Sequence, residues 1–189
     1  MSRLDLIAGP NGAGKTTLYQ RVIRPARPGL PFVNADLIAR DRFPGDESAN
    51  AYEAARIAAR ARQALIDARL DFCTETVFSH ASKVELVTTA TAAGYDVVLH
   101  VVMIPPELSS RRVASRVAAG GHDVPTGKLV SRYQRLWPLV AVAARHCYRT
   151  LFWNNAADNG PFEVASYRYG TADYPPRWPA WTPQPLLEL

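Results

Sequence analysis

The sequence contains few of the residues and patterns that mark several protein classes. Only two of its 189 residues are cysteines, Cys73 and Cys147, and they form neither a zinc-type spacing nor a Cys-x-x-Cys pair, which favours buried free thiols. The longest nearly apolar run, residues 97–106, is far shorter than the ~20 residues that a membrane-spanning helix needs. The segment before the first glycine includes Arg3 and Asp5 and is too short for the apolar stretch of a secretory signal. We therefore expect a cytoplasmic protein without a membrane span.

The composition indicates one soluble folded domain rather than a disordered or repetitive chain. Hydrophobic residues make up 48% of the sequence and charged residues 21%, and the length is sufficient for one core. The formal net charge of +5 suits an anionic ligand such as a nucleotide, and it would also suit nucleic acid. Because the basic residues are scattered and no aromatic–glycine signature is present, we do not expect a nucleic-acid partner.

Short apolar segments alternate along the chain with longer segments of helical character. The clearest strand, residues 95–104, is a valine-rich run bounded by Gly94 and Pro105, which is typical of a strand buried on both faces of a sheet. The predicted strands are 4–8, 31–34, 72–76, 95–104 and 148–153, and the predicted helices are 15–23, 46–68, 81–93, 107–119 and 128–145, with Pro138 as an expected kink. The alternation predicts an α/β fold with a mostly parallel, doubly wound sheet flanked by helices.

The end of the sequence differs from the rest in composition. Residues 174–185 contain five prolines and two tryptophans, Trp178 and Trp181, which favours an extended segment docked on the surface. We expect one domain over residues 1–173 and a C-terminal tail over residues 174–189.

The strongest motif, Gly-Pro-Asn-Gly-Ala-Gly-Lys-Thr-Thr, lies between the first predicted strand and the first predicted helix. It matches the phosphate-loop pattern completely, so we expect a single-domain P-loop NTPase fold. Its glycines let backbone N–H groups turn towards phosphate oxygens, and the helix N-terminus adds its dipole. Lys15 is expected to reach the β- and γ-phosphates of ATP, and the Thr16 hydroxyl to ligate Mg²⁺. The predicted nucleotide-binding residues are Gly9, Pro10, Asn11, Gly12, Ala13, Gly14, Lys15, Thr16 and Thr17.

Other classes of phosphate-loop protein lack support in the sequence. The Ser-Gly-Gly-Gln signature of ABC-type ATPases and the Asn-Lys-x-Asp guanine reader of GTPases are both missing. The strand at 95–104 ends without the carboxylate that mechanical ATPases use for Mg²⁺. A small kinase is the class that remains.

Two polar segments should lie at the carboxyl edge of the sheet, beside the phosphate loop: one follows the predicted strand at 31–34, and the other ends the predicted strand at 72–76. Asp36 can accept the proton of a substrate hydroxyl during phosphoryl transfer, or it can cap the helix that begins there. Glu75 and Thr76 can hold substrate hydroxyls or a metal-bound water, or they can belong to a solvated loop.

Three arginines are candidates for binding the phosphates. Arg112 and Arg116 are four residues apart and share one face of a predicted helix, and Arg132 lies in the next helix. Guanidinium groups can close over transferring phosphates and stabilise the transition state, although solvation explains any single helical arginine better. His122, in the loop between these helices, is expected to form loop hydrogen bonds rather than to act as a base.

Taken together, these segments resemble the zeta toxin family of small-molecule kinases. The resemblance is carried by the phosphate loop at residues 9–17, Val-Asn-Ala-Asp at 33–36, Thr-Glu-Thr at 74–76, the arginine-bearing helix and the Gly-Gly-His-Asp-Val-Pro stretch. It covers most of residues 3–135. The order and spacing of the segments, more than the phosphate loop alone, point to this family.

The resemblance implies specific roles and partners. It implies Asp36 as the catalytic base, Glu75 and Thr76 as substrate contacts, and Lys15, Arg116 and Arg132 as phosphate clamps. We assign Arg112 to substrate binding, and Lys128 competes with Arg132 for the second clamp. The resemblance also implies UDP-N-acetylglucosamine as the acceptor and an antitoxin as protein partner, although the chain is shorter than the best-known members and has little room for a sugar-binding insertion.

The sequence thus predicts an ATP-dependent phosphotransferase that acts on a hydroxyl group of a small molecule, such as a UDP-amino sugar. Three alternatives stay open: a housekeeping kinase for another metabolite, an ATP-binding partner protein without transferase activity, and a nucleic-acid end kinase.

Overall fold

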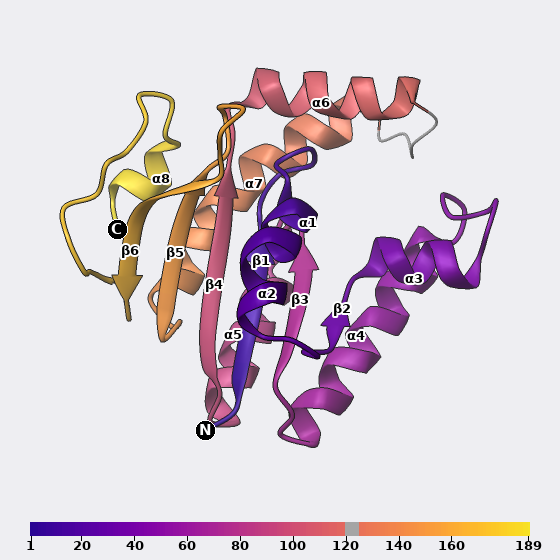
Figure 1. Cartoon of the computed structure of the whole chain (residues 1–189), viewed down its shortest axis with the longest axis horizontal. Coiled ribbons are helices and arrows are strands. Elements are labelled where there is room, and N and C mark those ends of the chain that lie inside the picture. The colour runs from indigo at the N-terminus through magenta and orange to yellow at the C-terminus, as the bar shows by residue number, and fades with distance from the viewer. Residues whose placement is uncertain (120–124) are drawn as a thin grey trace.

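The computed structural model describes residues 1–119 and 125–189, and in this part of the chain helices cover both faces of one seven-stranded sheet (Figure 1). The strands are β1 (Arg3–Ala8), β2 (Phe32–Val33), β3 (Phe72–Thr76), β4 (Asp96–Met103), β5 (Arg149–Asn154), β6 (Phe162–Arg168) and β7 (Thr171–Ala172). The helices are α1 (Lys15–Leu18), the π-helical segment η1 (Tyr19–Ile23), α2 (Arg24–Ala26), α3 (Ala35–Arg42), α4 (Ala51–Asp67), α5 (Ser82–Ala92), α6 (Pro106–Ala118), α7 (Thr126–Ala144) and α8 (Gln184–Leu187).

The strands lie in the order β2-β3-β1-β4-β5-β6-β7. Neighbours from β2 to β5 run parallel, whereas β6 and β7 are antiparallel to the strands beside them. The prediction of an α/β fold with a mostly parallel sheet is confirmed, but it missed β6 and β7. In β6 only the four middle residues are buried, and one of them is Ser166, so the segment has no continuous apolar run.

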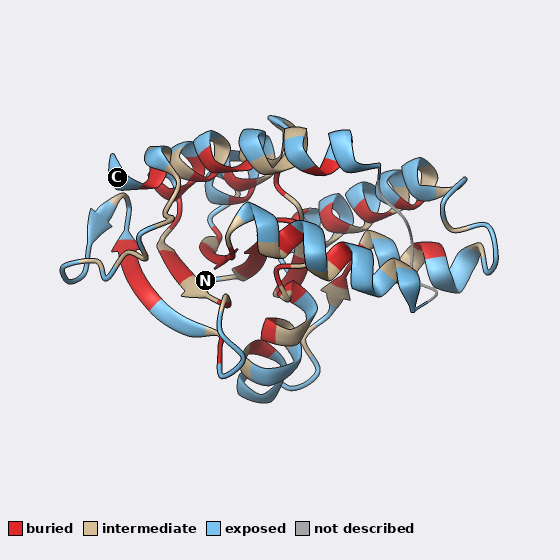
Figure 2. Cartoon of the chain, turned by 90° about the horizontal axis from the view of Figure 1, so that it is seen from above, coloured by how far each residue is buried: buried red, intermediate tan, exposed pale blue. Residues whose placement is uncertain are grey.

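Side chains of the central strands alternate between the two faces of the sheet. Leu4 and Leu6 belong to the larger core cluster, which also contains residues of α4, α5 and α7. Ile7 points to the other face and packs in a smaller cluster with Leu18 and Ile23, from the helix that follows the phosphate loop. In the view from above, the buried residues gather on the strands and on the inner sides of the helices (Figure 2).

Two predicted helix boundaries were wrong. The predicted helix at 46–68 begins only at Ala51, because residues 47–50 form turns and the Glu47 carboxylate accepts from the N–H of Gly45. The first helix continues past Ile23 through α2, and Pro25 lies in this three-residue segment just before the helix ends at Ala26.

The C-terminal segment packs on the sheet and on α7. Leu186 is fully buried in the larger core cluster, and the ring centroid of Trp178 lies 5.1 Å from that of Phe152. Among the described residues, no helix has the length and apolar character to cross a membrane.

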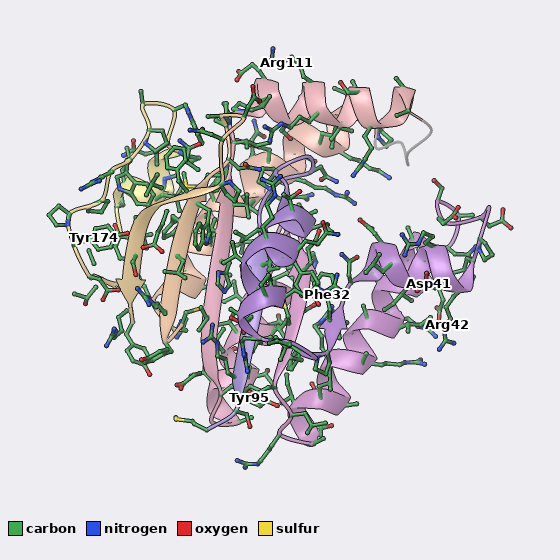
Figure 3. The ribbon with its side chains drawn as sticks, in the orientation of Figure 1. Phe32, Asp41, Arg42, Tyr95, Arg111 and Tyr174 are labelled. Carbon is green, nitrogen blue, oxygen red and sulfur yellow. The ribbon has the colours of Figure 1, made fainter. Side chains whose placement is uncertain are left out.

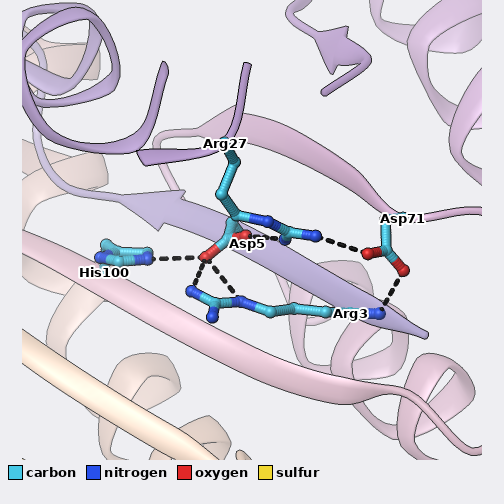
Figure 4. Close-up of polar contacts among 5 residues, drawn as sticks. All are labelled: Arg3, Asp5, Arg27, Asp71 and His100. Atoms are coloured by element: carbon cyan, nitrogen blue, oxygen red, sulfur yellow. Dashed lines mark hydrogen bonds and ion pairs between the residues drawn. The ribbon is translucent and has the colours of Figure 1, made fainter. Parts of the chain in front are cut away.

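A polar cluster ties β1 to the chain that leaves α2 (Figure 4). Asp5 is fully buried and accepts from Arg3 and Arg27, each at 2.6 Å, and from His100 at 3.1 Å, while Arg27 also pairs with Asp71. Burial alone would raise the pKa of Asp5, but hydrogen bonds from His100 and Arg3 and their charges lower it to about 2. Cavities of about 360 and 300 Å³ lie beside Arg27. Arg27 follows α2, so these cavities are at the end of the α1–η1–α2 segment that is farther from the phosphate loop.

Candidate active site

The phosphate loop leaves β1 at the carboxyl edge of the sheet, between the ends of β3 and β4. Ala8, the last residue of β1, pairs with Thr76 of β3 and with Val101 of β4. Val33 of β2 pairs with Thr74, so the residues after β2 emerge beside those after β3. The topology therefore brings the phosphate loop, the Asp36 segment and the Glu75 segment to one edge of the sheet, which is where α/β sheets bind ligands.

The first glycine of the loop permits a close backbone approach. A Cβ on Gly9 would lie 2.5 Å from the carbonyl oxygen of Val102, and Gly9 has a φ of 153°. Any side chain here would push the loop away from β4, so the motif requires glycine for a steric reason.

Lys15 is buried and folds back over the loop. Its ammonium group donates to the carbonyl oxygens of Gly9 and Pro10, both at 3.0 Å. Burial lowers the pKa of Lys15 below its ordinary value, because the charged form is poorly solvated there. An anionic ligand at the loop would favour the charged form and draw the ammonium away from the two carbonyl oxygens.

The charges around Lys15 belong to residues that the sequence singled out. The carboxylates of Glu75 and Asp36 act to raise its pKa, against the larger effect of burial. The guanidinium groups of Arg116 and Arg132 act in the opposite direction and lower it further. Side chains of β3, α3, α6 and α7 therefore lie within electrostatic range of the Lys15 ammonium group.

Thr16 and Glu75 form a direct link between the loop and β3. The Thr16 hydroxyl donates to Glu75 Oε2 at 2.9 Å, and Asn34 Nδ2 donates to the same oxygen at 3.0 Å. A hydroxyl and a carboxylate oxygen at this spacing are the kind of ligands that Mg²⁺ prefers. Thr76 is half-buried, and its hydroxyl oxygen accepts from the N–H of Phe78.

Asp36 is exposed in the first turn of α3, and it does not cap that helix. The capping oxygen belongs to Asn34, whose Oδ1 accepts from the N–H groups of Asp36 and Leu37 at 2.8 and 3.2 Å. The alternative that Asp36 serves as the N-cap is therefore wrong. Within the described residues its carboxylate accepts no backbone hydrogen bond, and its charge acts on Lys15.

The three candidate arginines lie on α6 and α7. Arg112 is half-buried beside the loop. A Cβ added to Gly12 would lie 3.1 Å from the Cβ of Arg112. Arg116 is exposed on the same helix, and Arg132 is half-buried on α7. Arg111 points away from the rest of the molecule (Figure 3). Lys128 is exposed near the start of α7. His122 and the other residues of 120–124 lie outside the described residues.

Sequence reasoning missed three polar residues that build the site. They are Asn34, Ser109 and Asn155, all buried. Asn34 could have been found as the helix N-cap, since asparagine is favoured there. Ser109 and Asn155 bond to loop carbonyl oxygens 98 and 142 residues away in the chain, and no local pattern signals such contacts.

The family model described as Zeta toxin matches residues 3–147. No curated protein matches the sequence.

Solved structures share the fold at low sequence identity. The AvrRxo1-ORF1:-ORF2 structure with ATP has a TM-score of 0.72 and 17% identity, over 92% of this chain and 60% of that chain. The structure from the PezAT toxin–antitoxin system of Streptococcus pneumoniae has a TM-score of 0.58 and 14% identity, over 86% of this chain and 72% of that chain. A provisionally described kinase from Chloroflexus aurantiacus has a TM-score of 0.56 and 19% identity, over 71% of this chain and 79% of that chain. The chain thus spans less than two thirds of the length of AvrRxo1-ORF1:-ORF2 chains it matches.

Proposed function

The chain belongs to the zeta toxin family, and from this premise we propose that it is an ATP-dependent kinase that transfers the γ-phosphoryl group to a hydroxyl of a small molecule. The observation that carries the proposal is the contact between the phosphate loop and β3, where the Thr16 hydroxyl donates to Glu75 at 2.9 Å beside the buried Lys15. The charges of Asp36, Arg116 and Arg132 lie close enough to act on the Lys15 ammonium group. A phosphate loop alone would serve any nucleotide-binding protein. A carboxylate and two arginines placed around it are what phosphoryl transfer requires.

Each residue has a definable part in the transfer. Lys15 and the loop N–H groups bind the β- and γ-phosphates. The acceptor hydroxyl oxygen forms a bond to the γ-phosphorus while the bond from that phosphorus to the β–γ bridging oxygen breaks. The proton of the hydroxyl passes to the Asp36 carboxylate, and the bridging oxygen leaves on ADP. Arg116 and Arg132 stabilise the negative charge on the transferring group.

Thr16 and Glu75 are the residues that would hold Mg²⁺. The hydrogen bond between them places both oxygens at the phosphate end of α1. When bound, the ion neutralises charge on the β- and γ-phosphates. Asn34 holds the Glu75 carboxylate from its other side and so keeps it oriented towards the loop.

For the acceptor we propose a sugar nucleotide, with UDP-N-acetylglucosamine as the first candidate. A polyhydroxylated ring suits the polar groups of Asp36, Glu75 and Thr76. The helices α6 and α7 carry Arg111, Arg112, Arg116, Lys128, Arg132 and Arg135 against one acidic residue, Glu107, which favours an acceptor with phosphates of its own. A housekeeping kinase that acts on another hydroxyl compound would use the same residues for transfer.

We further propose a protein partner that restrains the activity, an antitoxin. The support is the fold shared with the PezAT toxin–antitoxin system and with AvrRxo1-ORF1:-ORF2, which was solved as a complex. Co-expression with the product of an adjacent small reading frame, followed by size-exclusion chromatography, tests this partner. Separate elution of the two proteins would count against it.

The kinase proposal is tested by phosphorus NMR of the protein with Mg-ATP and a panel of UDP-sugars, free sugars and nucleosides. We expect a new phosphomonoester resonance with the UDP-sugars, together with ADP. Phosphorylation of another compound alone would overturn the acceptor and keep the kinase. Intact ATP with every compound would favour an ATP-binding protein without transferase activity.

A further inference from the structure

Two side chains from distant parts of the fold bind the phosphate loop from outside. Ser109, in α6, donates its hydroxyl hydrogen to the carbonyl oxygen of Asn11 at 2.7 Å. Asn155, directly after β5, donates from Nδ2 to the carbonyl oxygen of Ala13, also at 2.7 Å. Ser109 is 5% exposed and Asn155 is 8% exposed, so neither bond competes freely with water.

These two bonds fix the orientation of two peptide planes. In a trans peptide the C=O group and the following N–H group point in opposite directions. A carbonyl of Asn11 held towards α6 therefore turns the N–H of Gly12 away from α6. A carbonyl of Ala13 held towards Asn155 turns the N–H of Gly14 away in the same manner. Within the described part of the chain, neither of these N–H groups donates a hydrogen bond.

The glycines make such external control necessary. Gly12 and Gly14 have φ values of 73° and 89°, a region where glycine moves freely because it has no Cβ. A loop of this composition can rotate its peptide planes at little cost, and each rotation would turn an N–H donor away from the phosphates. Asn155 also lies so close to Gly14 that a Cβ there would collide with its amide nitrogen.

We propose that Ser109 and Asn155 are positioning residues, which hold the Gly12 and Gly14 N–H groups towards the β- and γ-phosphates of the nucleotide. This proposal rests on the nucleotide site of the proposed function. It requires that removing either side chain weakens binding of the phosphate chain and leaves binding of the nucleoside part unchanged. A purely structural role would weaken all ligands alike.

The test is calorimetric titration of wild type, Asn155→Ala and Ser109→Ala with ATP, inorganic tripolyphosphate and AMP. We expect roughly tenfold weaker binding of ATP and of tripolyphosphate in each variant, as for the loss of one oriented charge-assisted hydrogen bond, and unchanged AMP binding. Neighbouring residues give matched controls. Ser110→Ala removes a hydroxyl that bonds within α6, and Asn154→Ala removes an amide that bonds to its own loop; both should bind as wild type.

Equal weakening for ATP and AMP, or unchanged ATP affinity in either variant, would overturn the proposal. If Asn155→Ala does not fold, Asn155→Leu retains about the same volume, removes the donor without adding a charge and carries the same expectation. Failure of the kinase proposal is distinguishable, because it would appear as absent phosphoryl transfer by a wild-type protein that still binds ATP with the expected dependence on Ser109 and Asn155.

Discussion

At the scale of single residues, Asp36 gives the clearest test of the proposed transfer step. Because Asn34 caps α3, Asp36→Asn should leave the helix intact. We expect unchanged ATP affinity and a fall in phosphoryl transfer of roughly 10²–10⁴-fold, the usual range for a lost general base. Transfer assays and ATP titrations on the same preparation measure the two quantities.

Asp41→Asn is the matched control for this change. Asp41 lies on the same helix (Figure 3) and is exposed, and among the described residues it pairs with its neighbour Arg40 alone. The Asp41→Asn variant should transfer phosphate at the wild-type rate. A fully active Asp36→Asn variant would remove Asp36 from the mechanism.

Arg116 is expected to act mainly on the transition state. Arg116→Ala should lower kcat far more than it weakens ATP binding, since charge on the transferring group is greatest in the transition state. Arg111→Ala, which removes an outward-pointing arginine from the same helix, should change neither quantity. Steady-state kinetics of both variants provide the comparison, and equal kcat values for Arg116→Ala and wild type would contradict the assignment.

The sequence predicts those site residues whose role follows from a local motif. Lys15 and Thr16 belong to one contiguous pattern, Asp36 follows a recognisable strand, and Glu75 lies at the end of another. It did not predict that Glu75 bonds to Thr16, because that contact depends on the pairing of β1 with β3. The bonds of Ser109 and Asn155 are less predictable still, since they depend on where α6 begins and where β5 ends beside the loop.

At the scale of elements, Asn34 joins the start of α3 to β3. Asn34→Ala removes both the cap of α3 and the hydrogen bond to Glu75, so we expect a loss of about 1 to 2 kcal/mol in the free energy of unfolding. Asn50→Ala is the matched control, because within the described residues Asn50, at the N-cap position of α4, makes no side-chain cap bond and donates only to the exposed carbonyl oxygen of Asp46. Denaturant unfolding measures the free energy of unfolding of both variants. An equal loss of this free energy in Asn34→Ala and Asn50→Ala would argue against this role of Asn34.

Helices and strands could be predicted from the sequence where their residues are buried along the whole element. Strand β4 is almost wholly buried and was predicted within one residue at each end. Strand β6 carries exposed residues at both ends, and the two residues of β7 are exposed, so neither has an apolar pattern of its own. Their pairing with β5 and with each other arises from tertiary contacts, which a local sequence pattern does not contain.

At the scale of the whole molecule, the polar cluster around Asp5 couples stability to pH. The pKa of the Asp5 carboxyl is about 2 against an ordinary value of 3.8, so the folded state binds a proton at Asp5 less readily than the unfolded state does. The resulting stability is fully present above about pH 4 and is lost as the pH falls through about 2. The shift corresponds to roughly 2 to 3 kcal/mol.

Asp5→Asn should abolish this part of the pH dependence and destabilise the protein by roughly 3 kcal/mol at neutral pH, because Arg27 loses a buried partner. Denaturant unfolding of variant and wild type between pH 2 and pH 7 is the measurement. Asp158→Asn, at an exposed position, is the control. Parallel stability curves for Asp5→Asn and wild type would show that the cluster does not supply the coupling.

The most direct test of phosphoryl transfer by this chain is mass spectrometry of a small-molecule extract incubated with the protein and ATP that carries an isotopically labelled γ-phosphate, with Mg²⁺ present. Wild type should produce a hydroxyl compound heavier by one labelled phosphoryl group, together with ADP. Lys15→Ala, which lacks the buried cation of the loop, should produce neither. Wild-type protein that leaves every compound and ATP unchanged, or Lys15→Ala that forms the same labelled product at the same rate, would contradict the account.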